Sequence, residues 1–174
     1  MRFGRLAACL LALAGAACAT TGAVPRPFPT PGADGTGTPA RPPLSQPLRL
    51  DGGTIAGTAL ALRGVRYRPG GEDPSGFDCS GLVVYVFAQH GIGMPRLVRE
   101  QYEVGRRVKP AAVKPGDLLF FSTKGGGASH VAIAIGDNQF VHAPNSTGVV
   151  RVEALSSEYW GPRYLGARRI TTNN

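Results

Sequence analysis

One cysteine and two histidines are the residues of this 174-residue chain that could support nucleophilic chemistry. Cys79 follows a polar, Gly/Pro-rich segment (68–77) and opens an apolar run (82–87). This pattern predicts a loop that turns into a buried helix with the thiol on its first turn. Unpaired N–H groups and the positive dipole end of a helix N-terminus favour a thiolate over a thiol. A thiol in that position is typical of a nucleophile.

The histidines His130 and His142 flank one predicted hairpin. Segment 130–135 alternates between large apolar residues and small or polar ones, which predicts a strand, and segment 140–142 is expected to return beside it. Both histidines have the parity to point to one sheet face. The small alanines beside His130 leave room there for the helix that carries Cys79. One imidazole could then reach the sulfur, while the second imidazole holds the first in the right tautomer.

Two other readings of these three residues stay open at this point. A buried structural cysteine beside two histidines satisfied by backbone groups is common. Cys79, His130 and His142 could also be three ligands of a catalytic zinc ion with water in the fourth position. However, the spacing contains no short ligand pair of the CxxC or HExxH kind. We therefore predict no metal and no cofactor.

The elements that must position these residues form two groups along the chain. Helices are expected first and strands second, without βαβ alternation, which predicts an α+β fold with an antiparallel sheet of five to six strands. Besides the Cys79 helix, the expected helices are 53–63 and 96–105. The expected strands are 118–121, 130–135, 140–142, 149–152 and 164–170, with a hairpin turn at 136–138.

The N-terminus has the features of an export signal. Arg2 and Arg5 precede the apolar run 6–17, which is too short to span a bilayer. Residues 17–19 could form a signal-peptidase site. Alternatively, 15–18 resembles a bacterial lipobox with Cys18 as the acylated residue, although Gly15 stands where a lipobox usually has Leu. We predict a signal peptide over 1–18 and favour lipidation of Cys18.

Composition separates the rest of the chain into a tether and a domain. Segment 19–47 is rich in Pro and Gly and is predicted to be a disordered linker, while 48–172 is predicted to be the folded domain. The domain keeps a single cysteine, so it cannot form an internal disulfide. A lone thiol is unusual in an oxidising compartment unless it has a function.

The charge balance limits the classes of partner. The chain has 19 Lys and Arg against 11 Asp and Glu, a formal net charge of +8. A basic surface could meet nucleic acid, anionic lipid or an anionic polymer. No run of basic residues interleaved with aromatic ones is present, so we do not expect a nucleic acid partner.

Four separated blocks of sequence resemble the successive signature blocks of the NlpC/P60 cysteine peptidases. They are DCSGL (78–82), KPGDLLFF (114–121), SHVAI (129–133) and FVHAP (140–144). The blocks occur in the family's order and at its usual intervals, and the resemblance covers about 48–170. It implies a permuted papain-like fold. It also implies hydrolysis of peptidoglycan stem peptides or crosslinks, at γ-D-Glu–diaminopimelate or D-Ala–diaminopimelate bonds.

The resemblance also assigns roles to residues. It implies that Cys79 is the nucleophile, His130 the general base and His142 the orienting third member. It further places four residues at the substrate cleft or the oxyanion site: Tyr67, Asp78, Ser80 and Ser129. Asp78 could equally cap the helix, Ser129 could simply begin a strand, and Tyr67 could cap the core as a loop aromatic. Arg96 and Gln101 match the family pattern without an assigned role.

Together these features predict an exported cell-wall cysteine endopeptidase that acts through a Cys79 thioacyl-enzyme, with peptidoglycan as its partner. We expect it in the periplasm, anchored through acylated Cys18, with the outer membrane favoured. The alternatives are a non-catalytic wall-binding protein and a thiol amidase or acyltransferase with another substrate. The sequence leaves the oligomeric state open.

Overall fold

The structure is a computed structural model that describes residues 51–145 and 148–170. The predicted leader (1–18), with Cys18, and the predicted linker (19–47) lie outside the described residues. The helices are α1 (Gly52–Ala61), α2 (Cys79–Ala88) and α3 (Val98–Gln101), with 3-10 turns η1 (Pro110–Ala112) and η2 (Gly161–Arg163). The strands are β1 (Glu72–Asp73), β2 (Gly76–Phe77), β3 (Arg106–Val108), β4 (Leu118–Phe121), β5 (His130–Gly136), β6 (Gln139–His142), β7 (Arg151–Ala154) and β8 (Tyr164–Arg169).

Six of the strands form one antiparallel sheet in the order β3-β8-β4-β5-β6-β7. The remaining two, β1 and β2, form a small hairpin just before α2. The predicted α+β class with an antiparallel sheet of five to six strands is confirmed.

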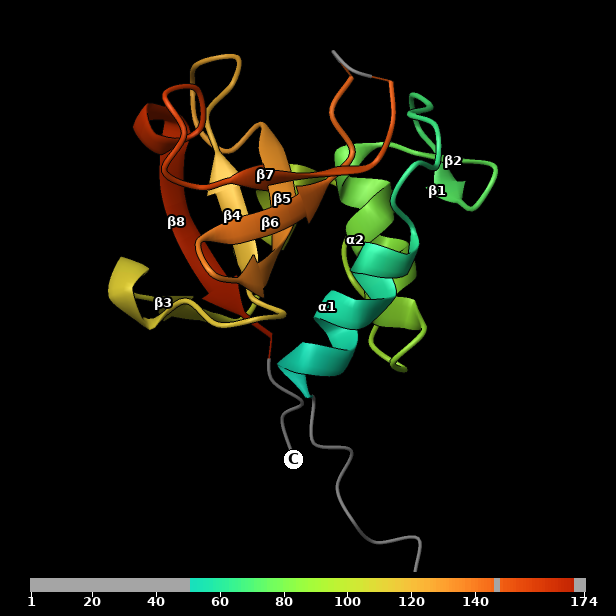
Figure 1. Ribbon diagram of the computed structural model, residues 1–174, viewed down its shortest axis with the longest axis horizontal. Coiled ribbons are helices and arrows are strands. Elements are labelled where there is room, and N and C mark those ends of the chain that lie inside the picture. The colour runs from blue at the N-terminus through green and yellow to red at the C-terminus, as the bar shows by residue number, and fades with distance from the viewer. Residues whose placement is uncertain (1–50, 146–147, 171–174) are drawn as a thin grey trace, which may run out of the picture. The chain divides into compact units, whose positions relative to one another are not determined.

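Helices α1 and α2 cover one face of the sheet (Figure 1). Their apolar side chains meet the sheet in one core cluster, in which Val83, Val86 and Phe87 of α2 pack with Val131 and Ile133 of β5. These five side chains are fully buried. Each such burial contributes about 1.5–3 kcal/mol relative to exposure. The helix that begins at Cys79 is therefore firmly held against β5.

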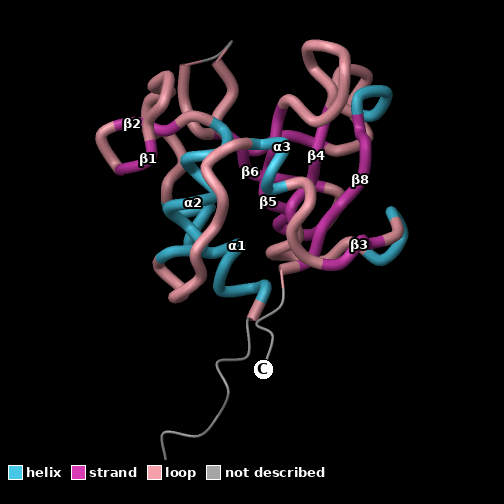
Figure 2. The backbone as a smooth tube through the Cα atoms, turned by 180° about the vertical axis from the view of Figure 1, so that it is seen from behind, coloured by secondary structure: helices cyan, strands magenta, loops and turns pink. Residues whose placement is uncertain are grey.

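A second core cluster occupies the opposite face of the sheet. There Ala132 and Ala134 of β5 pack with Phe121, Phe140 and Trp160. The prediction that the Cys79 helix lies on this alanine face is wrong, because the space beside the alanines is filled by aromatic rings. Figure 2 shows the arrangement from behind, with α1 and α2 on one side of β4, β5 and β8.

The β5–β6 turn agrees with the sequence prediction for 136–138. Gly136 pairs with Gln139, so Asp137 and Asn138 form a two-residue loop. Both have positive φ, 48° and 59°. This is the conformation of a type I′ turn, which Asp and Asn tolerate better than other non-glycine residues. Beyond the turn, a register shift between Ala134 and Gly136 makes Ala134 pair with Phe140. This shift brings the two strand histidines to one face.

The segment after α2 departs most from the sequence prediction. Only Val98–Gln101 is helical, instead of the expected 96–105. Leu97 and Val104 are exposed, and of the apolar residues expected to face the core only Tyr102 packs against it. Gly105, with φ 76°, instead turns the chain into β3, which pairs with β8. Strand β7 also differs from the prediction, because it begins and ends two residues later than the expected 149–152.

None of the helices in the described part of the chain is long and apolar enough to cross a membrane.

Candidate active site

Cys79 is the first residue of α2, and its position follows from the residues around it. Asp78 caps the helix by accepting a hydrogen bond from the Gly81 backbone N–H at 2.7 Å. Such a cap satisfies one of the unpaired N–H groups of a helix start. Phe77, one residue earlier, is fully buried and anchors the incoming strand. Cys79 is a free cysteine and is only partly exposed.

Cys79 and His130 line the same pocket, which has a volume of about 130 Å³. Tyr67 and Ser129 line it as well, so the structure brings together four of the seven predicted catalytic and cleft residues. The other lining residues are Thr123, Lys124, Ala143, Pro144, Asn145, Tyr159 and Trp160. Asp78, Ser80 and His142 lie outside this lining.

His142 lies directly behind His130. The Nε2 atom of His130 is 2.9 Å from Nδ1 of His142, and the two rings are perpendicular. His142 is fully buried and His130 nearly so. Because Nε2 of His130 faces His142, its Nδ1 is the ring nitrogen left for the pocket. Trp160 stacks on the His130 ring, with 5.2 Å between ring centroids and 27° between planes.

Burial governs the charge state of these groups. It lowers the pKa of both histidines to about 3, and the facing His142 adds to this effect at His130. Burial also raises the pKa of the Cys79 thiol, as does the Asp78 carboxylate, against the backbone N–H groups of Val131 and Ser80. The sequence favours a thiolate at Cys79. The structure instead gives a neutral thiol beside a neutral imidazole.

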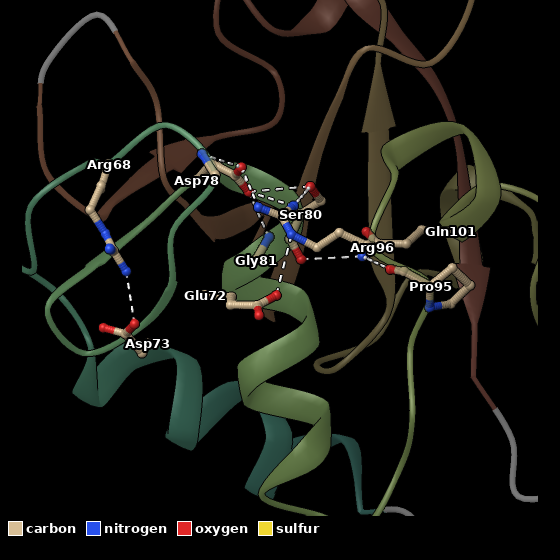
Figure 3. A network of polar contacts seen from close by, with 10 residues as sticks. Arg68, Glu72, Asp73, Asp78, Ser80, Gly81, Pro95, Arg96 and Gln101 are labelled. Atoms are coloured by element: carbon tan, nitrogen blue, oxygen red, sulfur yellow. Dashed lines mark hydrogen bonds and ion pairs between the residues drawn. The ribbon is translucent and has the colours of Figure 1, made fainter.

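Asp78 and Ser80 take part in a polar network at the first turn of α2 (Figure 3). Arg96 donates to both carboxylate oxygens of Asp78, at 3.0 and 2.6 Å, and to Oγ of Ser80 at 2.6 Å. Its Nε lies 3.3 Å from Glu72. The buried Gln101 adds a hydrogen bond from Nε2 to the Ser80 carbonyl at 3.2 Å. Arg96 and Gln101 thus hold the first turn of α2.

Ser129 organises a loop as well as lining the pocket. Its Oγ accepts hydrogen bonds from the backbone N–H groups of Thr123 at 2.8 Å and Lys124 at 3.2 Å. These contacts tie the β4–β5 loop to the start of β5. Ser129 thereby fixes the pocket wall next to His130.

The zinc alternative requires three ligand side chains to converge on one ion. Within the described ranges, no three side chains of the His, Cys, Asp or Glu type are grouped closely enough to hold a metal. The ring nitrogen of His130 that points away from the pocket faces His142 instead.

Sequence reasoning missed several residues of this site. Trp160, which stacks on His130, is the only tryptophan of the chain. Glu153, Lys124 and Tyr159 were also not singled out. A lone tryptophan is a usable signal in a sequence. The other three have none, because their proximity to the site arises only from the fold.

Comparison with known proteins decides the family. The NlpC/P60 family profile matches residues 64–169, which include the thiol, both histidines and all six strands of the main sheet. The chain belongs to the NlpC/P60 family. The resemblance found in the sequence is thereby confirmed.

Two relatives illustrate the range within the NlpC/P60 family. The chain is 46% identical over 123 residues to the gamma-DL-glutamyl hydrolase of Bacillus subtilis (strain 168), covering 68% of this chain and 30% of that protein. It is 43% identical over 113 residues to the murein DD-endopeptidase MepS/murein LD-carboxypeptidase of Escherichia coli (strain K12), covering 64% and 59%. The chain thus spans less than two thirds of the length of both relatives.

Solved structures give the same fold. An NlpC/P60 family protein from Bacillus cereus ATCC 10987 superposes with a TM-score of 0.67 at 31% identity. The superposition covers 71% of this chain and 41% of that one. The NlpC/P60 fold predicted from the sequence is confirmed by this likeness.

Proposed function

We propose that this protein is a cysteine peptidase that hydrolyses amide bonds in the peptide stems or crosslinks of peptidoglycan. One observation carries the proposal: Cys79 lines the same pocket as His130, whose Nε2 lies 2.9 Å from Nδ1 of His142. A nucleophile, a base and an orienting group in this order form a catalytic triad. The substrate class is supported by relatives named for gamma-DL-glutamyl hydrolysis and for murein endopeptidase activity.

In the proposed first step, Nδ1 of His130 takes the proton from Cys79 as the sulfur attacks the amide carbonyl carbon. Because burial lowers the pKa of His130 to about 3, its imidazole is neutral at rest and its Nδ1 can take the proton, but the same low pKa makes it a weak base. The tetrahedral intermediate then collapses. The C–N bond breaks, the leaving amine takes the proton from His130, and the acyl group stays on Cys79 as a thioester.

In the proposed second step, water attacks the thioester while His130 accepts one of its protons. The C–S bond breaks, the product leaves as a carboxylic acid, and the proton on His130 returns to the sulfur. Donors at the pocket stabilise the oxyanion of both intermediates: the backbone N–H of Cys79 at the helix start and the phenol of Tyr67. Burial raises the pKa of Tyr67, which keeps it protonated as a donor. One such donor is worth about 3 kcal/mol in a transition state.

The pocket also suits a substrate that carries carboxylates. Lys124 is the only Lys, Arg, Asp or Glu among the pocket-lining residues in the described part of the chain. A cation there attracts an anionic group of the substrate, while the thiol attacks the peptide amide. Both candidate bonds, γ-D-Glu–diaminopimelate and D-Ala–diaminopimelate, lie next to free carboxylates. We therefore keep both as proposed targets.

We place the protein outside the cytoplasm, because peptidoglycan lies there. The leader predicted at 1–18 supports export to the periplasm, and the lipobox-like residues 15–18 support a membrane anchor at Cys18, with the outer membrane favoured. The net charge of +8 would help the protein dwell near an anionic envelope.

The release of soluble fragments from purified peptidoglycan tests the proposed chemistry. We expect release by the wild type, none by Cys79→Ala, loss after iodoacetamide and no change with a chelator. Loss with the chelator would favour the zinc alternative. Wall binding without release would favour a non-catalytic binding protein. A thiol that alkylates readily without any release would favour another acyl substrate.

A further inference from the structure

Glu153 lies on the far side of the two histidines from Cys79. It belongs to β7, where it pairs with Phe140 of β6. Its Oε1 lies 3.7 Å from Nε2 of His142, and its Oε2 accepts a hydrogen bond from Nε1 of Trp160. Oε1 also lies 3.1 Å from Nε of Arg151, whose side chain is largely exposed.

The Nε2 atom of His142 needs a partner. It is buried, and no hydrogen-bond partner lies within bonding distance among residues 51–145 and 148–170. Oε1 of Glu153 approaches it to 3.7 Å, slightly beyond hydrogen-bond distance. A neutral imidazole carries one donor and one acceptor nitrogen, whereas an ionised carboxylate only accepts. Glu153 therefore selects the His142 tautomer that carries its proton on Nε2.

We propose that Glu153 is a positioning residue that sets the tautomers of both histidines and so frees Nδ1 of His130. With the proton on Nε2, His142 presents the lone pair of Nδ1 to His130. His130 must then donate from its own Nε2, and its Nδ1 keeps the lone pair that faces the pocket. The catalytic meaning of this chain of hydrogen bonds rests on the proposed function, whereas the tautomers themselves do not.

Glu153 also fixes the ring that covers both histidines. Trp160 stacks on His130 and meets His142 edge-on, with 4.9 Å between the ring centroids. Its indole N–H has a single donor direction, and Glu153 accepts it. One carboxylate thus orients His142 through Oε1 and the covering indole through Oε2. It also places a negative charge behind the imidazole that becomes positive during the reaction.

The tautomers can be observed directly by ¹⁵N NMR of the full chain labelled at histidine. The chain has only three histidines, and His90→Gln assigns the third. We expect the proton on Nε2 of both His130 and His142 in the wild type. Glu153→Gln is nearly isosteric, and its amide can keep an oxygen on Trp160 while turning its NH₂ toward His142. We expect this variant to move the His142 proton to Nδ1, and Glu153→Asp to keep it on Nε2.

Two results would overturn the proposal: a wild-type His142 protonated on Nδ1, or an unchanged ring pattern in Glu153→Gln. If that variant fails to fold, the wild-type tautomer alone decides between the two outcomes. These readouts need no substrate. A protein without hydrolytic activity would therefore refute the proposed function and leave the tautomer assignment standing.

Kinetics on the same variants separate positioning from a merely structural role. We expect Glu153→Gln to lower kcat about tenfold or more with KM changed less than about twofold, and Glu153→Asp to recover part of the loss. Glu158→Gln is the matched control, because Glu158 is an exposed glutamate in the connection that follows β7, and it should match the wild type. Equal kcat in the wild type and Glu153→Gln would contradict the positioning role.

Discussion

The Cys79–His130 pair shows how burial shapes reactivity at single residues. The helix N-terminus favours a thiolate, but desolvation of both groups favours the neutral pair. Proton transfer from Cys79 to His130 therefore has to occur during the attack on the substrate, because the resting site holds no preformed thiolate–imidazolium pair. This makes the base more important than the group that orients it.

The two histidines should differ in the cost of their replacement. We expect His130→Gln to lower kcat by about 10²–10⁴, because proton transfer is lost. His142→Gln should cost less, since an orienting group acts only through His130. Steady-state rates on a defined stem peptide measure both, with thermal melting to confirm the fold. A larger loss in His142→Gln than in His130→Gln would contradict the assigned roles.

The Asp78–Arg96 pair should make stability depend on pH in a defined direction. Burial alone would raise the pKa of Asp78, but the hydrogen bonds and charge of Arg96, together with the Gly81 N–H, hold it below its usual range. A carboxyl with a lowered folded pKa stabilises the fold above its unfolded pKa of about 3.9. That contribution is lost as the pH falls through the folded pKa.

We therefore expect Asp78→Asn to be less stable than the wild type at neutral pH, with a deficit that shrinks as the pH falls below about 3.9. Urea unfolding at several pH values measures this difference, with Glu158→Gln as the control. A deficit that grows toward acid pH would show that Asp78 contributes by another route.

At the scale of elements, the start of α2 is held by close backbone packing. A Cβ built on Gly81 would lie 1.9 Å from the Gly71 carbonyl oxygen, a backbone atom that cannot simply rotate away. A Cβ built on Gly57 of α1 meets nothing within 4 Å. Both glycines lie in helices, but only Gly81 has a backbone neighbour that leaves no room for a side chain.

Alanine substitution at these two glycines should have opposite effects. Gly81→Ala should push α2 away from the β1–β2 hairpin, displace Cys79, and lower both stability and the rate of thiol alkylation. Gly57→Ala should stabilise the protein by about 0.5–1 kcal/mol, because alanine favours a helix. Chemical unfolding and iodoacetamide kinetics measure the pair. Normal stability in Gly81→Ala would show that the hairpin is not a fixed wall.

The sequence predicted the elements whose signals are local. The 118–121 strand, the 136–138 turn and the cysteine at a helix start all rest on neighbouring residues. The face of β5 that receives the helix could not be predicted, because Phe140 and Trp160 reach Ala132 and Ala134 only through the fold. Strand β3 was missed for a similar reason. Its exposed arginines show no apolar alternation, and it forms because β8 offers a free edge.

At the scale of the whole molecule, the two ends of the main described chain lie far from the start of α2. Figure 1 shows the start of α1 and the end of β8 at one end, while α2 begins at the other.

The anchor can be tested on the full chain expressed in a bacterium that acylates lipoproteins. We expect a labelled fatty acid to be incorporated into the wild type and Cys9→Ala, and lost in Cys18→Ala. The Cys18→Ala protein should also move from the membrane to the soluble fraction. Cys9 is the matched control, because it lies inside the same apolar run. Label retained by Cys18→Ala would point to simple secretion or to another modified residue.

The most direct measurement is a digest of defined muropeptides, read by mass spectrometry, with the wild type beside Cys79→Ala. We predict new fragments that appear only with Cys79 present and whose masses sum to that of the parent muropeptide plus one water. Their masses identify the γ-D-Glu–diaminopimelate or the D-Ala–diaminopimelate bond as the one cut. Intact muropeptides after exposure to a folded protein with a reactive thiol, or equal cleavage by Cys79→Ala, would contradict it.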